Sequence, residues 1–309
     1  MQKKLLVIGA ANMDFTMPVH SLPAAGEQST ENSRFHYAAG GNGATAAMTI
    51  TRLHGEAVYV ARVGDDVHGS RLLRLYADAG MDVSHITVDR RNPTGMRVII
   101  QEDSGDSRVV SYPGANAELL SSDAERAILD TQPAAVCLQM DLPSDVLIGT
   151  ARMAEAHGIP LFLDSAGMSP QFPFASLPHM EVFLMDDKDT HALTGTMPIG
   201  SDSCLKAAVE LEKKVKAHHY LIKLGERGIF AYDGRYCHMI LSSGLRMSEN
   251  RPLCEAASAA ILLEYCRNGG DVQGACRFGL SLNALLIKNN QDPAYFPTEE
   301  EVRAFSEKH

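Results

Sequence analysis

Short apolar runs alternate with amphipathic stretches of helical spacing along most of the chain. Residues 4–9 are typical of a buried strand, and residues 44–54 place Ala47, Ile50 and Leu53 on one helical face. The same patterns predict further strands at 57–63, 134–139, 160–164, 182–185 and 220–223, a hairpin at 228–240, and helices at 69–79, 122–130, 144–157, 187–194, 203–216, 255–266 and 272–289. Alternating strands and helices predict an α/β fold with a parallel sheet covered on both faces.

Two segments break this alternation. Residues 94–102 and 107–111 are strand-like and flank a polar stretch that suits a hairpin turn, and residues 31–39 are compatible with an extended conformation. We therefore interpret residues 15–36 and 95–112 as β insertions, which form a small lid on one large domain that spans residues 1–309.

Composition narrows the class of protein. The 28 Lys and Arg residues against 38 Asp and Glu residues give a net charge of −10, which argues against nucleic-acid or membrane partners but allows a local basic site for a phosphate. The six cysteines form no Cys-x-x-Cys pair, as expected for reduced thiols in a cytoplasmic protein. The N-terminal apolar run ends before Asn12 and Asp14, so a buried strand suits it better than a signal peptide.

Two candidate binding segments lie in the first part of the chain. Asn12 and Asp14 follow the first expected strand, where α/β sheets bind ligands, and an exposed pair there could chelate sugar hydroxyls. A simple turn explains the pair equally well. The glycine-rich stretch 40–45 opens a helix and would let a ligand approach the backbone, although a close contact between helix and sheet is the alternative.

Two further candidates follow later strands. Residues 224–228 could cradle a nucleotide, but a plain turn into the hairpin is favoured when this segment is taken alone. The carboxylates at residues 186–189 suit Mg²⁺, which prefers oxygen ligands. A solvated first helical turn is again the favoured alternative, because acidic residues stabilise helix N-termini.

Taken in order, these segments resemble the ribokinase-like (PfkB) family of sugar kinases. Residues 9–14 match the family's glycine followed by Asn-x-Asp, and residues 40–47 resemble its Gly-Gly-x-Gly-Ala-Asn segment. Residues 63–69 match its Val-Gly-x-Asp-x-x-Gly stretch, and the segments 93–95, 113–117 and 223–228 follow in the family's order. The resemblance spans almost the whole chain, and it implies a three-layer α/β/α domain with a mostly parallel central sheet and a β-sheet lid.

The resemblance also implies an activity and its residues. Family members transfer the γ-phosphate of ATP to a hydroxyl of a sugar, a sugar derivative or a nucleoside, with Mg²⁺. The substrate-binding residues implied are Asn12, Asp14, Gly40, Gly41, Asn42 and Asp141; the nucleotide-binding residues are Lys223, Gly225, Gly228, Arg251 and Cys254; and the metal ligands are Asp186 and Asp189, in place of an Asn-x-x-Glu pair. A monovalent cation is left open, because Glu249 and Asn250 alter the loop that would bind it.

The chain departs from the family at its C-terminal signature, Asp-Thr-Thr-Gly-Ala-Gly-Asp. Here the sequence reads Glu-Asn-Arg-Pro-Leu-Cys-Glu over residues 249–255, so Glu255 stands in place of the Asp base. Glu255 keeps a carboxylate that can accept a proton, but residues 252–254 add side chains where Gly-Ala-Gly would form an anion hole. Two hypotheses follow: a phosphotransferase that uses Glu255 as base, or an impaired or inactive relative that binds a sugar or nucleoside without phosphorylating it.

The resemblance leaves the substrate and the assembly open. Thr45 and Asn42 replace the Asn and Lys that ribokinases usually carry, which puts ribose in doubt and leaves other sugars, sugar acids and nucleosides as candidates. The lid could also join two chains edge to edge in a homodimer, because an uncovered strand edge favours pairing.

Overall fold

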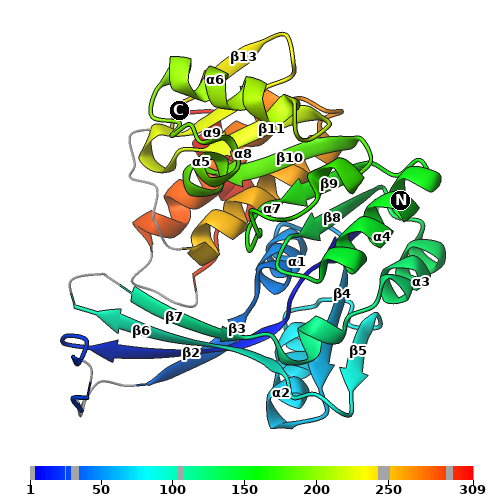
Figure 1. The fold of residues 1–309 in the computed structure, drawn as a ribbon, viewed down its shortest axis with the longest axis vertical. Helices are drawn as coiled ribbons and strands as arrows, with labels where there is room; N and C mark the ends of the chain where they lie inside the picture. Colours follow the sequence, from blue (N-terminus) through cyan, green and yellow to red (C-terminus); the bar gives the residue numbers. More distant parts are fainter. Residues whose placement is uncertain are drawn as a thin grey trace.

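The computed structural model describes residues 4–24, 26–28, 35–103, 107–242, 251–289 and 295–308, with only the backbone for residues 251–254. Its centre is a nine-stranded sheet in the order β13-β12-β11-β10-β9-β8-β1-β4-β5 (Figure 1). The strands from β5 to β11 pair in parallel, and β12 and β13 extend the sheet in antiparallel fashion. Their bounds are β1 Leu5–Ile8, β4 Ala57–Gly64, β5 Ile86–Asp89, β8 Ala135–Gln139, β9 Leu161–Asp164, β10 Met180–Asp186, β11 Ala217–Lys223, β12 Ile229–Tyr232 and β13 Cys237–Ile240.

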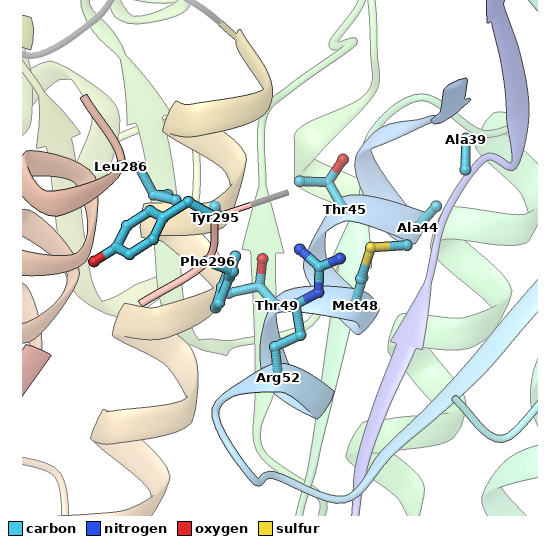
Figure 2. Close-up of a pocket in the computed structure, with 10 residues that line it drawn as sticks. Ala39, Ala44, Thr45, Met48, Thr49, Arg52, Leu286, Tyr295 and Phe296 are labelled. Atoms are coloured by element: carbon cyan, nitrogen blue, oxygen red, sulfur yellow. The ribbon is translucent and has the colours of Figure 1, made fainter. Parts of the chain in front are cut away.

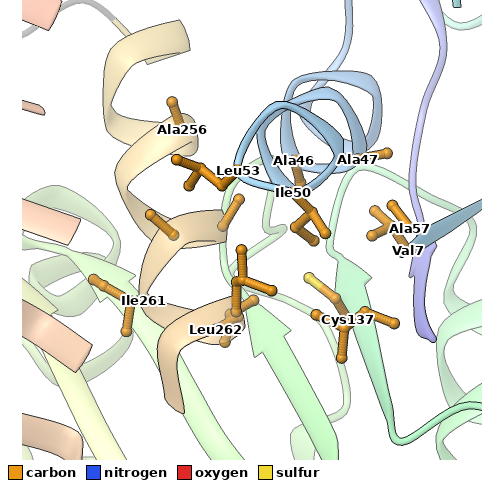
Figure 3. Packing of buried hydrophobic residues seen from close by; sticks show 14 of the residues in the cluster. Val7, Ala46, Ala47, Ile50, Leu53, Ala57, Cys137, Ala256, Ile261 and Leu262 are labelled. Atoms are coloured by element: carbon orange, nitrogen blue, oxygen red, sulfur yellow. The ribbon is translucent and has the colours of Figure 1, made fainter. Parts of the chain in front are cut away.

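Helices cover both faces of this sheet. Successive side chains of a strand point to opposite faces, so both faces are apolar and both are buried by helices. In β1, Leu5 and Val7 join the hydrophobic cluster beneath one set of helices, while Leu6 and Ile8 join the cluster beneath the other. The first set is α1 Asn42–Arg52, α2 Val67–Asp78, α7 Arg251–Arg267, α8 Val272–Lys288 and α9 Glu299–Ser306. The second is α3 Ser121–Thr131, α4 Ser144–Ala156, α5 Asp187–Thr194 and α6 Ser201–Glu212. Figure 3 shows α1 and α7 packed side by side through residues such as Ile50 and Leu262.

A separate four-stranded sheet forms the lid and projects away from the helical layers (Figure 1). Its order is β3-β2-β6-β7, with β2 and β6 parallel and the other pairs antiparallel. The bounds are β2 Asn12–Val19, β3 His36–Gly40, β6 Gly95–Glu102 and β7 Ser107–Tyr112. The lid therefore pairs β2 with a strand about 80 residues further on, as the register of Asp14 with Arg97 shows.

The structure confirms the predicted α/β class, the mostly parallel sheet and the lid, and it corrects four details. Asn12 and Asp14 begin strand β2 instead of forming an exposed turn. Helix α7 begins at Arg251, four residues before the expected start. Strand β5 and helix α9 were not predicted, because β5 buries only Asp89 and α9 buries only Val302, which leaves no clear apolar pattern.

Neither a membrane-spanning helix nor a disulfide occurs within the described part of the chain. None of its helices is both long enough and apolar enough to cross a bilayer. The described cysteines, at positions 137, 204, 237, 266 and 276, are all free thiols.

Candidate active site

Asn12 is held at the start of β2 by a second asparagine. Its Oδ1 accepts a hydrogen bond of 2.8 Å from Nδ2 of Asn116, and Oδ1 of Asn116 accepts one of 2.8 Å from the amide of Ala11. A Cβ on Gly95 would lie 2.4 Å from Asn12 Oδ1 and 2.1 Å from Asn116 Nδ2, so this contact requires glycine there. Asn116 lies at the start of the chain segment after the lid, in the run 113–117, and fixes the orientation of the Asn12 amide.

Asp14 forms an ion pair with an arginine of the lid. Nε of Arg97 donates a hydrogen bond of 2.9 Å to Asp14 Oδ1, and Nη2 of Arg97 donates to Oδ2. Both side chains are largely buried, with 10% of Asp14 and 16% of Arg97 exposed. A Cβ on Gly40 would lie 2.1 Å from the Asp14 carboxyl carbon, so Gly40 provides the space in which the carboxylate sits.

The glycine-rich turn before α1 packs directly on the end of β1. A Cβ on Gly43 would lie 2.6 Å from Gly9 Cα, and one on Gly41, whose φ is +99°, would lie 2.1 Å from the carbonyl oxygen of Ala10. The hydroxyl of Tyr59 donates to the same carbonyl at 2.9 Å. The predicted close contact between helix and sheet is therefore present, and it places the start of α1 beside Asp14 and Asn12.

Asp141 lies just after β8 and faces this turn. Its Oδ1 accepts a hydrogen bond of 3.2 Å from the amide of Ala10, and the Nδ2 of neighbouring Asn42 donates to the carbonyl of Ala166 at 3.3 Å. Burial raises the pKa of Asp141 to about 6, against the pull of its backbone hydrogen bonds and of Arg97. The predicted substrate residues Asn12, Asp14, Gly40, Gly41, Asn42 and Asp141 are thus brought together.

We expect Asp141→Asn to stabilise the protein above pH 6 and to leave its stability unchanged near pH 4. Between an unfolded pKa of about 3.8 and the folded value of about 6, the folded state holds a proton that the unfolded chain has lost. Wild-type stability therefore falls as pH rises through this range, by up to about 3 kcal/mol, and stays lower above it. Urea unfolding at pH 4, 5, 6 and 7.5 measures this difference.

The exposed Asp145 in α4 provides the control for this pH dependence. Asp145→Asn should show no gain that grows between pH 4 and 6. An Asp141→Asn variant whose stability runs parallel to wild type across this range would contradict the expected burial effect.

A buried cation stands beside the expected base. Glu255 is only 5% exposed, and its Oε1 lies 3.9 Å from Nζ of Lys223 at the end of β11. The same Nζ donates to the hydroxyl of Ser258 at 2.9 Å and lies 3.7 Å from Oδ2 of Asp164 at the end of β9. Two strand ends and the first turns of α7 therefore meet around one ammonium group.

This cluster is joined electrostatically to the lid. Burial tends to lower the pKa of Arg97, but its hydrogen bonds to Asp14 and the charges of Asp14, Asp141 and Glu255 raise the pKa overall. The lid arginine thus lies within electrostatic reach of both the expected substrate residues and the expected base.

The early start of α7 changes the surroundings of the expected anion hole. In a helix that begins at Arg251, residues 252–254 lie within the first turn, and the amide of Glu255 is already an interior donor. Pro252 has no amide N–H to offer a phosphate. The side chains of Arg251 and Cys254, and residues 249 and 250, lie outside the described residues.

The expected nucleotide loop folds as a short 3-10 turn, η3 Gly225–Arg227, after β11. Arg227 anchors this turn. Its Nη1 donates a hydrogen bond of 2.9 Å to the carbonyl of Pro198, and its Nη2 lies 3.5 Å from Oδ2 of Asp187 at the start of α5. A Cβ on Gly225 would meet nothing within 4 Å, whereas one on Gly228 would lie 2.0 Å from the carbonyl oxygen of Ile240. Gly225 therefore faces open space, and Gly228 is packed against β13.

We expect Gly225→Ala and Gly228→Ala to have different effects. Gly225→Ala should cost about 1 kcal/mol of stability, because φ is +60°, but should raise KM for ATP several-fold if the nucleotide packs on this surface. Gly228→Ala should cost at least about 2 kcal/mol through backbone strain and contact with Ile240. Thermal unfolding and KM for ATP separate the two. An unchanged KM in Gly225→Ala would place the nucleotide elsewhere.

The predicted metal ligands Asp186 and Asp189 lie at the start of α5. Asp186 Oδ1 caps this helix by accepting a hydrogen bond of 2.6 Å from the amide of Asp189. Oδ2 of Asp189 accepts a hydrogen bond of 2.7 Å from the Ser165 hydroxyl. No group of three or more His, Cys, Asp or Glu side chains that could hold a metal occurs among the described residues. Two carboxylates fit Mg²⁺, which takes one or two of them together with substrate phosphates and water.

A pocket of about 190 Å³ lies beside α1 (Figure 2). Thr45, Met48 and Arg52 line one wall, and Tyr295 and Phe296 line the other. The Arg52 guanidinium lies 5.0 Å from the centre of the Phe296 ring. Ala39 and Ala256, the chain neighbours of Gly40 and Glu255, also line this pocket, so it borders the candidate site.

Comparison with known proteins places the chain in a family. The family model for the pfkB family carbohydrate kinases matches residues 2–242. The chain belongs to this family. The match includes the Asn12 and Asp14 strand, the glycine-rich turn and the loop at Gly225, and it ends before Glu255.

Relatives and solved structures agree with this assignment. A ribokinase of Haemophilus influenzae is 24% identical over 99% of both chains, and one of Arabidopsis thaliana is 27% identical over 72% of this chain and 60% of the plant protein. The structure of the Arabidopsis ribokinase complexed with ribose and ATP matches with a TM-score of 0.85 at 21% identity, over 99% of each chain. A ribokinase structure from Giardia lamblia matches with a TM-score of 0.87 at 20% identity, over 100% of this chain and 99% of the other. These structures establish the ribokinase fold for the pfkB member described here.

Three residues of this pfkB site were not identified from the sequence. Asn116 and Arg97 act on Asn12 and Asp14 across the lid, and Tyr59 supports the Ala10 carbonyl from β4. The run that contains Asn116 was noted, but its contact with Asn12 depends on the fold. Arg97 stands two residues after Gly95 on a predicted lid strand, and only the pairing of β2 with β6 reveals its partner.

Proposed function

We propose that the protein transfers the γ-phosphate of ATP to a hydroxyl of a sugar, a sugar derivative or a nucleoside, with Glu255 as the general base. The observation that carries this proposal is the position of the Glu255 carboxylate, buried and 3.9 Å from the Lys223 ammonium. A neighbouring cation favours the ionised carboxylate, which is the form that accepts a proton.

The proposed reaction begins with the substrate held under the lid. Asn12, Asp14 and Asn42 bind and orient its hydroxyl groups, so that one of them faces Glu255. That hydroxyl oxygen forms a bond to the γ-phosphorus while the bond from this phosphorus to the bridging oxygen of ADP breaks, and the hydroxyl proton passes to Glu255. Mg²⁺, held by Asp186 and Asp189, would offset charge on the phosphates. Lys223 keeps the base ionised, and Gly225 lies where the nucleotide would approach.

One observation favours the alternative of an impaired or inactive sugar-binding relative. Residues 252–254 lie within the first turn of α7, and Pro252 lacks an amide N–H. Fewer backbone donors are then available to stabilise the transferring phosphoryl group, which depends on positioned donors.

Release of ADP from Mg-ATP in the presence of sugars, sugar acids and nucleosides tests the proposal. Substrate-dependent ADP release supports the kinase. Stabilisation of the protein by a ligand in thermal unfolding, with no ADP release for any substrate, supports the inactive alternative.

We also propose that the lid edge joins two chains. Strand β7 is exposed along its length, with Val110 70% and Val109 52% exposed. Such an apolar edge favours strand pairing. We expect the wild type to have the mass of a dimer in light scattering and Val110→Lys to be monomeric. Val67→Lys, at an equally exposed valine of α2, should remain dimeric, and a monomeric wild type would refute the proposal.

A further inference from the structure

The lid arginine has donors that its partner Asp14 does not use. A guanidinium has five N–H donors arranged along two edges, one formed by Nε and Nη2 and one formed by Nη1 and Nη2. Asp14 occupies the first edge of Arg97 through Oδ1 and Oδ2. The N–H groups of the second edge donate to none of the described residues.

The second edge belongs to a side chain that is only 16% exposed and lies on the substrate face of the lid. Arg97 and Asp14 are register partners on β6 and β2, and Gly95, two residues earlier on β6, lies against Asn12. By the two-residue alternation of a strand, Gly95 and Arg97 share the face that carries Asn12 and Asp14. Arg97 therefore lies among the residues proposed to hold the sugar.

With one edge of the guanidinium paired to Asp14, the other edge is suited to bind a second oxyanion. The planar fork matches the two oxygens of a carboxylate or a phosphate, and the hydrogen bonds are strengthened by charge. A hydroxyl group offers only one oxygen and no charge to the same fork. The edge is thus better matched by an anionic group than by a neutral polyol.

The carboxylates around Arg97 do not cancel this preference. Asp14 is paired with Arg97 itself, and Glu255 lies beside the Lys223 ammonium. Burial raises the pKa of Asp141 to about 6, so its negative charge is largely removed only below that pH. An anion at the open edge of Arg97 is therefore expected to bind most tightly at mildly acidic pH, where Asp141 no longer repels it.

We infer that Arg97 is a specificity-determining residue and that the substrate is an anionic sugar, which bears a carboxylate or a phosphate at the end held by Asp14 and Arg97. This inference rests on the proposed function in taking the lid face as the sugar site. It does not require that phosphate transfer occur.

Binding without nucleotide tests the inference. Isothermal titration of ribose, ribonate and ribose 5-phosphate compares a neutral sugar with the carboxylate and phosphate forms of the same carbon skeleton. We expect one anion to bind the wild type at least about tenfold more tightly than ribose, as one charge-assisted pair would give. Whichever anion binds more tightly identifies the group. Equal affinities for all three ligands, or no binding of either anion, would overturn the inference.

Two variants of Arg97 test whether the preference for an anionic sugar over ribose depends on this residue. Arg97→Met should reduce the discrimination to less than about threefold, and Arg97→Lys, which keeps a charge beside Asp14 but loses the fork, should retain part of it. Arg71→Met is the matched control, because Arg71 is an exposed arginine stacked 4.2 Å from the ring of Tyr37 at the lid. An anion preference that survives in Arg97→Met would also overturn the inference.

The binding measurement and the kinase assay test different proposals, so either proposal can be refuted without the other. A protein that binds an anionic sugar and releases no ADP would refute the proposed phosphotransfer and leave the role of Arg97 intact. A protein that phosphorylates ribose and binds no anion would do the reverse.

Discussion

Replacing Glu255 by Gln is expected to lower kcat for substrate-dependent ADP release by about 10²- to 10⁴-fold, the usual effect of losing a general base. The amide of Gln has nearly the same shape as the carboxylate but cannot accept a proton at neutral pH. Glu255 is 5% exposed and lies in the second turn of α7, so the replacement should stay in place. Binding of the sugar, measured by thermal stabilisation, should change little.

A second glutamate on the same helix provides the control. Glu264, near the C-terminal end of α7, is 9% exposed and accepts two hydrogen bonds of 3.0 and 2.9 Å from Arg303. Glu264→Gln should lower the melting temperature through loss of this ion pair and leave kcat unchanged. If Glu255→Gln retained the wild-type kcat, Glu255 would not be the base, even if the protein proved to be a kinase.

The sequence predicted the central sheet well because its strands are buried on both faces. Runs such as Leu5–Ile8 and Leu161–Asp164 are buried at every position. Strand β2 was missed at its start, because Asn12 and Asp14 are typical turn residues, and they become strand residues only through pairing with β3 and β6.

The sequence indicated candidate residues for the site, but it did not indicate the contacts that those residues make. A motif shows that Asp14 and Asp141 bear carboxylates after particular strands, and the fold brings Asp141 to the amide of Ala10 and Asp14 to Gly40. What no spacing reveals is that Asp14 is paired with Arg97, a residue 83 positions later. The same holds for Lys223, which was expected at the nucleotide but whose ammonium lies between Asp164 and Glu255.

The position of Lys223 leads to a second large effect. Lys223→Met should lower kcat at neutral pH and should move the acid limb of the kcat profile to higher pH. A neighbouring ammonium favours the ionised form of a carboxylate, so its removal raises the pKa of Glu255 and more of the base is protonated at a given pH. Part of the lost activity should therefore return as the pH is raised.

The variant also separates three roles for Lys223. Lys223→Arg keeps a cation near Glu255 and should keep the acid limb close to its wild-type position, although the larger group disturbs packing at a side chain only 7% exposed. A residue that acts only on stability would lower the melting temperature in both variants without moving the limb. If Lys223 instead binds the nucleotide, KM for ATP should rise in Lys223→Met while the acid limb stays fixed. A shifted limb with an unchanged KM assigns the ammonium to the base, where it would help Glu255 to remain ionised in a site that has lost the family's glycines.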